Sequence, residues 1–264
     1  MAIDYVLAAP CVPQETLGVE RLVELSRMRS MARTILAMRE AEGDTRPADQ
    51  IQVQFAIRRL GEDANDRGTT VAELLAETAP LDEVAPHCAT CPAGMPRELA
   101  CHQRIRYPIP EHVEQWLIGR LPESLGCTAG TFLVRALREF GWDGAPVERM
   151  RAAGTTFFES RVAYGVRWEA PDGDKIELST DTLFQMMFHV GPLQPTHALM
   201  LALFLGVLPH DLDLGALRDD TARRAALQAA RVTPTGDQDI EQLANFLRLL
   251  PHAALVELPI LIDG

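Results

Sequence analysis

A short stretch rich in cysteine and histidine, residues 87–102, constrains the fold of this 264-residue chain more than any other feature. It holds three of the five cysteines and two of the seven histidines. Pro92-Ala93-Gly94 lies among them and favours irregular backbone. Thiolate and imidazole are the ligands that zinc prefers, and a Cys-x-x-Cys turn can direct two sulfurs at one ion, about 2.3 Å away. The stretch therefore predicts a zinc knuckle.

The composition of the cluster also predicts the kind of metal site. Sites made of three thiolates and one imidazole, or of four thiolates, are typically structural, because no coordination position is left for water or substrate. The alternative is that the cysteines are small buried hydrophobic residues without a metal. The predicted metal ligands are Cys88, Cys91, Cys101 and His102. The fourth ligand stays open among His102, His87, Cys127 and Cys11.

Two other cysteine chemistries fit the cluster less well. An iron-sulfur cluster uses the same ligand types, but the gap between Cys91 and Cys101 matches neither common ferredoxin spacing. A thioredoxin-like motif would need a strand before Cys88 and a helix starting at it, whereas Ala85-Pro86 precedes and Pro92-Ala93-Gly94 follows. Zinc is therefore the expected metal, and a cysteine-based redox protein stays an alternative.

Cys127 is a separate candidate, because it stands just before a predicted helix. The positive end of that helix could lower the pKa of the thiol and make it a nucleophile. No partner base can be named from the sequence, so we expect Cys127 to be buried or to act as the fourth metal ligand.

Length and charge limit the classes of protein. A chain of 264 residues can bury a large core without a staple, so any metal is a local organiser. The net charge of -12 repels phosphate backbones, so we expect no nucleic-acid partner. The longest apolar run, 198–208, is shorter than the roughly 20 residues of a membrane-spanning helix, which predicts no membrane insertion. The first residues lack a signal-peptide pattern, so we expect a cytoplasmic protein, where clustered cysteines favour metal or thiol chemistry over disulfides.

Hydrophobic periodicity predicts most of the regular structure. Apolar residues recur at helical spacing over 19–41, and further helices are expected at 70–78, from Pro110 to about Pro122, and at 128–140. Residues 5–9 are expected to be a buried strand or an extended arm, and residues 51–57 a strand. A β-hairpin is expected from the alternation over 158–168, the turn at 171–174 and the apolar positions at 176–178, and helices from 182 to about 250 follow it.

These elements predict a mostly helical α+β protein, with the zinc knuckle in the N-terminal half and a β-hairpin followed by a helical C-terminal half. The expected regions are 1–145 and 146–264, which could also form one continuous domain. A sequence echo at an offset of 42 residues, such as Leu208-Pro209-His210 against Leu250-Pro251-His252, indicates either a repeated helical hairpin or similar helix ends.

The function expected from these features is that of a zinc-stabilised, non-catalytic adaptor or regulatory protein that binds another protein. An enzyme is the less favoured class, because phosphate-binding loops, nucleophile elbows and His-Glu-x-x-His motifs are missing from the sequence. The alternative is a metal-dependent hydrolase centred on His210 and Asp211, with His189 and His197 upstream, since such a site can generate hydroxide. The partner and the oligomeric state are not predicted.

Overall fold

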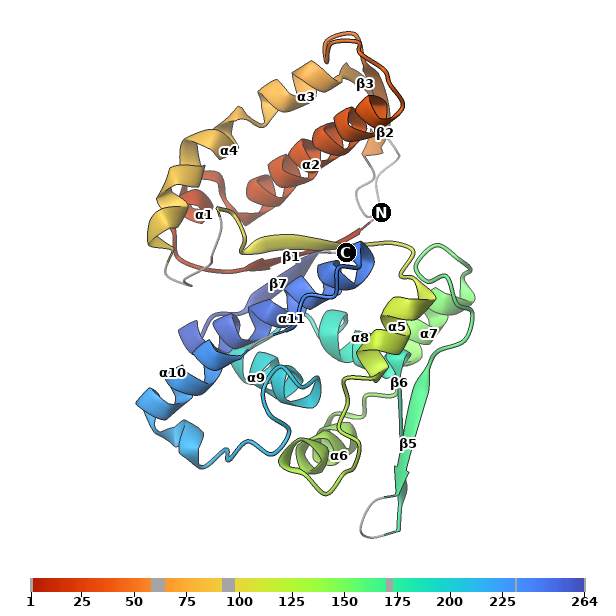
Figure 1. Cartoon of the computed structure of the whole chain (residues 1–264), viewed down its shortest axis with the longest axis vertical. Coiled ribbons are helices and arrows are strands. Elements are labelled where there is room, and N and C mark those ends of the chain that lie inside the picture. The colour runs from red at the N-terminus through yellow and green to blue at the C-terminus, as the bar shows by residue number, and fades with distance from the viewer. Residues whose placement is uncertain (1, 58–64, 92–97, 170–172, 231, 264) are drawn as a thin grey trace. The chain divides into compact units, whose positions relative to one another are not determined.

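The chain divides into two compact units in a computed structural model that describes residues 2–57, 65–91, 98–169, 173–230 and 232–263 (Figure 1). Unit 1 comprises Met1–Ala9 and Cys101–Gly264, and unit 2 comprises Pro10–Ala100. The boundary expected at residues 145–146 lies within unit 1. Helices and small antiparallel sheets make the protein α+β, as predicted. The predicted break at Pro92-Ala93-Gly94 and the first part of the predicted turn at 171–174 lie outside the described residues.

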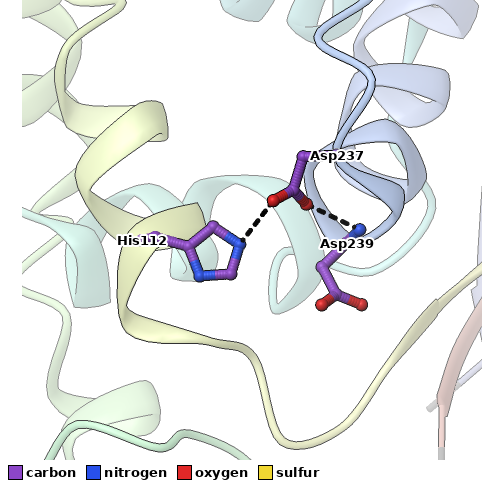
Figure 2. Close-up of side chains that lie close together, drawn as sticks. All are labelled: His112, Asp237 and Asp239. Carbon is purple, nitrogen blue, oxygen red and sulfur yellow. Dashed lines mark hydrogen bonds and ion pairs between the residues drawn. The ribbon is translucent and has the colours of Figure 1, made fainter.

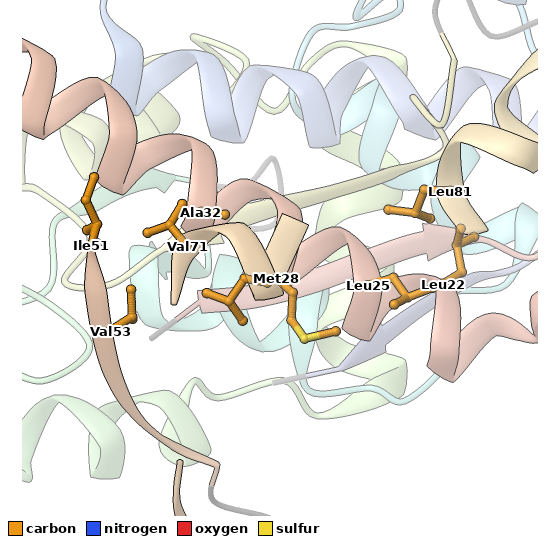
Figure 3. Packing of buried hydrophobic residues seen from close by; sticks show 9 residues of the cluster. Leu22, Leu25, Met28, Ala32, Ile51, Val53, Val71 and Leu81 are labelled. Atoms are coloured by element: carbon orange, nitrogen blue, oxygen red, sulfur yellow. The ribbon is translucent and has the colours of Figure 1, made fainter. Parts of the chain in front are cut away.

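Unit 2 is a helical layer against a β-hairpin. Its elements are α1 (Val12–Leu17), α2 (Val19–Ala41), β2 (Gln52–Ile57), β3 (Asn65–Thr70), α3 (Val71–Glu77), α4 (Ala79–Val84) and the 3₁₀ helix η1 (Ala85–Thr90). The predicted helix 19–41 is confirmed as α2. Leu22, Leu25 and Met28 on its apolar face are buried with Ile51 of the following loop and Leu81 of α4 (Figure 3). Each such side chain contributes about 1.5–3 kcal/mol when it is fully buried, so this cluster is the core of the unit.

A capping box starts α3, where the sequence predicts a capped helix. Thr70 Oγ1 accepts a hydrogen bond from the backbone N–H of Glu73 at 3.1 Å, and Glu73 Oε2 accepts one from the backbone N–H of Thr70 at 2.9 Å. These bonds satisfy two backbone donors that a helix start leaves open. The chain then runs through α4 directly into η1, so a helix precedes the Cys-x-x-Cys motif.

Unit 1 is built on a three-stranded antiparallel sheet in the order β4-β1-β7. Its strands and helices are β1 (Ala2–Leu7), β4 (His102–Arg106), α5 (Glu111–Ile118), α6 (Thr128–Phe140), α7 (Ala145–Ala152), β5 (Gly165–Glu169), β6 (Lys175–Ser179), α8 (Thr180–Phe188), α9 (Pro195–Phe204), η2 (Ala216–Arg218), α10 (Asp220–Ala229), α11 (Gln238–Val256) and β7 (Ile260–Asp263). The central strand β1 pairs Val6 with His102 and Tyr5 with Ile262. The last residues of the Cys-rich stretch therefore enter a sheet.

The predicted hairpin is present but shorter. Strands β5 and β6 pair from Gly165–Ser179 to Glu169–Lys175, and Trp168 on the buried face donates from Nε1 to the carbonyl of Pro122 at 3.2 Å. Phe158, expected in the first strand, instead forms an isolated parallel bridge with Ile109. Phe157 and Glu159, on either side of Phe158, form backbone hydrogen bonds with Ile109. The antiparallel ladder therefore starts only at Gly165, later than predicted.

The sequence echo does not produce a repeated hairpin. Helix α9 ends at Phe204, and Gly206 beyond it has a φ of 59°. The equivalent residue in the second copy is Arg248, in the middle of α11, and Pro251 also lies inside that helix. The apolar run that contains α9 is largely buried, and among the described residues no helix is both long and apolar enough to cross a membrane.

Candidate functional site

The four predicted zinc ligands fall into two groups. Cys88 and Cys91 belong to unit 2, whereas Cys101 and His102 belong to unit 1. Each pair has a defined environment within its own unit. The site that joins all four therefore stays a prediction, and the two pairs are described in turn.

Cys88 and Cys91 lie on one tight turn at the end of η1. The backbone N–H of Cys91 donates to the carbonyl of Cys88 at 3.0 Å, and both side chains are half-buried. Cys88 Sγ accepts a hydrogen bond from the backbone N–H of Leu99 at 3.4 Å. Leu99 has a φ of 53°, a conformation that costs a non-glycine residue about 1 kcal/mol or more, and its side chain packs against the unit 2 core. A backbone donor is therefore held against the sulfur of Cys88.

Cys11 lies near this turn because α1, which it precedes, packs against η1. Figure 1 shows α1 beside the end of α4, from which η1 continues. Burial raises the pKa of the Cys11 thiol, the Gln14 backbone N–H lowers it, and the thiols of Cys91 and Cys88 raise it further. A raised pKa keeps a thiol protonated and unreactive, which argues against Cys11 as a nucleophile.

His102 is held by a carboxylate within unit 1. His102 Nε2 lies 3.0 Å from Asp4 Oδ1, and their side chains are 8 % and 2 % exposed. The two residues are diagonal neighbours on β4 and β1, in the register that pairs Val6 with His102. Cys101 is buried beside them, and its carbonyl accepts the N–H of Leu7 at 3.0 Å. This environment accounts for the burial of both residues without a metal.

Cys127 acts as the N-cap of α6. Its Sγ accepts the backbone N–H of Gly130 at 3.3 Å and lies 3.3 Å from the carbonyl of Ser124 as a donor. A sulfur in this position takes the place of the usual capping oxygen. The helix 128–140 and its end at Gly141, with a φ of 61°, are as predicted. Cys127 is thus half-buried in a helix cap of unit 1.

One group of potential ligands in the described residues has its ligand atoms within 4.8 Å of one another: His112, Asp237 and Asp239 (Figure 2). His112 Nε2 lies 3.2 Å from Asp237 Oδ2, and Asp237 Oδ1 caps α11 by accepting the N–H groups of Asp239 and Ile240. The Ile240 N–H lowers the pKa of Asp237, and His112 lowers it further. Both carboxylates lie at the positive end of a helix, which disfavours a cation. The group is therefore the N-cap of α11, paired through Asp237 with His112 of α5, and it is only a weak candidate metal site.

The residues of the hydrolase alternative lie in separate environments. His210 is half-buried, and its backbone carbonyl accepts the N–H of Ala129 at 2.9 Å, while Asp211 is exposed. His189 Nε2 lies 3.1 Å from the sulfur of Met150. The His197 ring stacks on Trp142 with centroids 5.0 Å apart. In the part of the chain that is described, His210 and Asp211 belong to no group of three closely placed ligands.

His197 carries a testable pH dependence. Burial lowers its pKa from 6.5 to about 4, and its Nε2 has no hydrogen-bond partner among the described residues. Between these values the unfolded chain binds a proton that the folded chain does not, so stability is fully present above about pH 6.5 and is lost as the pH falls towards 4. We expect His197→Phe, which keeps a ring against Trp142, to lose less stability than the wild type over this pH range. The difference between the two losses in the free energy of unfolding is expected to be about 2 kcal/mol at most, because the site is partly hydrated. Urea unfolding at pH 4.5 and 7 measures the difference, and equal losses in variant and wild type would contradict it.

A buried polar network is the feature that sequence reasoning missed. Arg151 on α7 donates to Glu114 Oε1 and Oε2 at 3.0 and 2.6 Å and to Asp181 Oδ1 at 2.8 Å. Thr180 Oγ1 donates to Glu114 Oε2 at 2.6 Å, and the Arg151 guanidinium lies 4.1 Å from the centre of the Phe158 ring. Burial lowers the pKa of Arg151, but the bonds to Glu114 and Asp181 outweigh it and the net shift is upwards. The partners are distant in sequence, so no local pattern could reveal the network.

The network is structural in character, because all four polar side chains are buried and hydrogen-bonded to one another. The thiols of Cys88 and Cys91, which share one turn, stay the sequence-based candidate for metal ligation. No protein-family model matches the chain, and no curated protein and no solved structure matches it either.

Proposed function

We propose that the protein is a zinc-stabilised, non-catalytic adaptor or regulatory protein that binds another protein in the cytoplasm. The proposal follows from the ligand chemistry of unit 2, and zinc is its cofactor. Reduced thiolates persist in that compartment and can hold the metal.

The observation that carries the proposal is the folded Cys-x-x-Cys turn. Two half-buried sulfurs project from one turn, and the Leu99 N–H already donates to Cys88 Sγ. Structural zinc sites use such turns, and hydrogen bonds to the sulfurs hold the ligands in place. The pair would supply two of the four zinc ligands.

The binding role is supported by the surface next to the turn. Val12, the first residue of α1, is 42 % exposed and follows Cys11 directly. A metal that fixes α1 against η1 would fix the apolar side chain of Val12 on the surface, where a protein partner could bury it. The position of Val12 therefore links the metal to the binding role.

The experiment compares Cys88→Ser/Cys91→Ser with the matched variant Cys127→Ser, in which serine remains a good helix cap. The double variant is expected to melt at a lower temperature, to be insensitive to chelator, and to lose a partner that in-cell crosslinking attaches to the wild type. Cys127→Ser is expected to keep all three properties. A partner retained by the double variant, or none attached to the wild type, would contradict the adaptor role.

A further inference from the structure

We propose that the zinc site lies wholly within unit 2, with Cys11 as its third thiolate and His87 as its imidazole ligand beside Cys88 and Cys91. This inference rests on the proposed zinc function and changes its ligand set, because Cys101 and His102 are left out. The class of ligand is one divalent zinc ion in a closed Cys₃His site, without an open position for a substrate.

The ligand inventory of unit 2 is the first argument. Residues 10–100 contain three cysteines and a single histidine, which are the four residues named above. Three of them lie in or directly after η1 and the fourth stands at the start of α1. All the soft zinc ligands of the unit are thus placed on two short segments, and together they make a complete set.

Contact between those segments is the second argument. Helix α1 packs against η1 and α4, although about 70 residues separate them in the chain. Pro13, directly after Val12, is buried in this contact region of unit 2, whereas Cys11 itself keeps part of its surface exposed. The Cys11 thiol is therefore held near the Cys88 and Cys91 thiols and remains accessible to an ion.

A divalent cation between these thiols would attract each thiolate and offset their mutual repulsion. Binding would release one proton from each cysteine to solvent, and the neutral imidazole of His87 would coordinate through a ring nitrogen.

Side-chain movement must accompany binding. In the described structure the three sulfurs are not among the groups with all ligand atoms within 4.8 Å of one another, whereas zinc–sulfur bonds are about 2.3 Å long. His87 is exposed and the three cysteines are half-buried, so the proposal requires rotamer changes of side chains at the surface. The unit 2 core of α2, β2 and α3 can stay as it is.

Cys101 and His102 already have a structural role in unit 1. The Cys101 carbonyl accepts the Leu7 N–H, and the His102 ring is bonded to buried Asp4. Both residues belong to unit 1, whereas the proposed site is built from unit 2 alone, so they are left out of the ligand set.

The test uses Co²⁺ as the probe in the full-length protein, because the intensity of sulfur-to-cobalt charge-transfer absorption rises with the number of thiolates. The wild type is expected to show three thiolates. Cys11→Ser is expected to lose about one third of this absorption per bound ion and to bind zinc at least ten-fold more weakly. His87→Ala is expected to keep the three-thiolate absorption but to weaken binding. Cys101→Ala is expected to match the wild type in both properties.

The outcomes separate the two proposals. A wild-type spectrum in Cys11→Ser, or a loss of intensity in Cys101→Ala, overturns this ligand set while leaving a zinc protein in place. A wild type that binds neither zinc nor Co²⁺ overturns both proposals. Alkylation of the unmodified protein gives a readout that does not depend on folded variants. A chelator should expose Cys11, Cys88 and Cys91 together without changing the rate at Cys127, and an unchanged rate at Cys11 would overturn the inference.

Discussion

Replacing Arg151 by methionine is expected to lower the free energy of unfolding by about 3–5 kcal/mol. The substitution leaves the carboxylates of Glu114 and Asp181 buried without their only cationic partner among the described residues. Glu114 is fully buried and Asp181 is 5 % exposed, so water cannot take the place of the guanidinium. An unpaired buried charge costs more than the lost bonds alone, since it must be desolvated or protonated.

Arg149→Met on the same helix is the matched control for this prediction. Arg149 is exposed, so its replacement is expected to change stability by no more than about 0.5 kcal/mol. Urea unfolding at neutral pH measures both variants. Arg151→Lys is expected to recover only part of the loss, because an ammonium cannot make the paired bonds to Glu114. Equal stability of the two methionine variants would show that the network adds nothing to folding.

Gly130→Ala is expected to destabilise the protein by about 2–3 kcal/mol, even though alanine favours helices over glycine by about 1 kcal/mol. A Cβ at Gly130, in the first turn of α6, would lie 2.5 Å from the Cα of Leu125 and 2.8 Å from its carbonyl carbon. Both are backbone atoms, so relief requires the helix to move away from the preceding loop. That movement would also break the bond from the Gly130 N–H to Cys127 Sγ.

Gly126→Ala, in the loop before the helix, is the control for Gly130→Ala. A Cβ at Gly126 meets only the side-chain oxygen of Ser124, at 3.8 Å, and its φ lies outside the left-handed region. We expect its melting temperature to stay within a few degrees of the wild type, whereas Gly130→Ala melts clearly lower. A Gly130→Ala protein as stable as Gly126→Ala would mean that α6 and the Leu125 backbone do not touch in solution.

Local patterns predicted several of the helices, although not α1, α4 or α7. The range of α2 follows from its apolar spacing, and that of α6 from its periodicity and from Gly141 after its last residue. The capped start of α3 at Thr70 was also readable, because a capping box lies within four residues. In each case the determining interactions are close in sequence, so a single sequence is enough to reveal them.

Long-range pairing was not predictable in the same way. Strand β1 pairs with residues 102–106 and 260–263, which places the two ends of the chain in one sheet. Neither partner strand has a strong alternating pattern of its own. The same pairing makes Cys101 and His102 part of unit 1, whereas Cys88 and Cys91 belong to unit 2. Closeness in sequence had grouped these four residues as one predicted site.

Zinc content is the decisive quantity for the proposed function. Elemental analysis of the full-length protein, purified without chelator, is expected to give about one zinc ion per chain for the wild type and for Cys127→Ser, and close to none for Cys88→Ser/Cys91→Ser. A wild type that carries no zinc, takes up none from solution and keeps the thiols of Cys11, Cys88 and Cys91 reactive would contradict a zinc-stabilised protein.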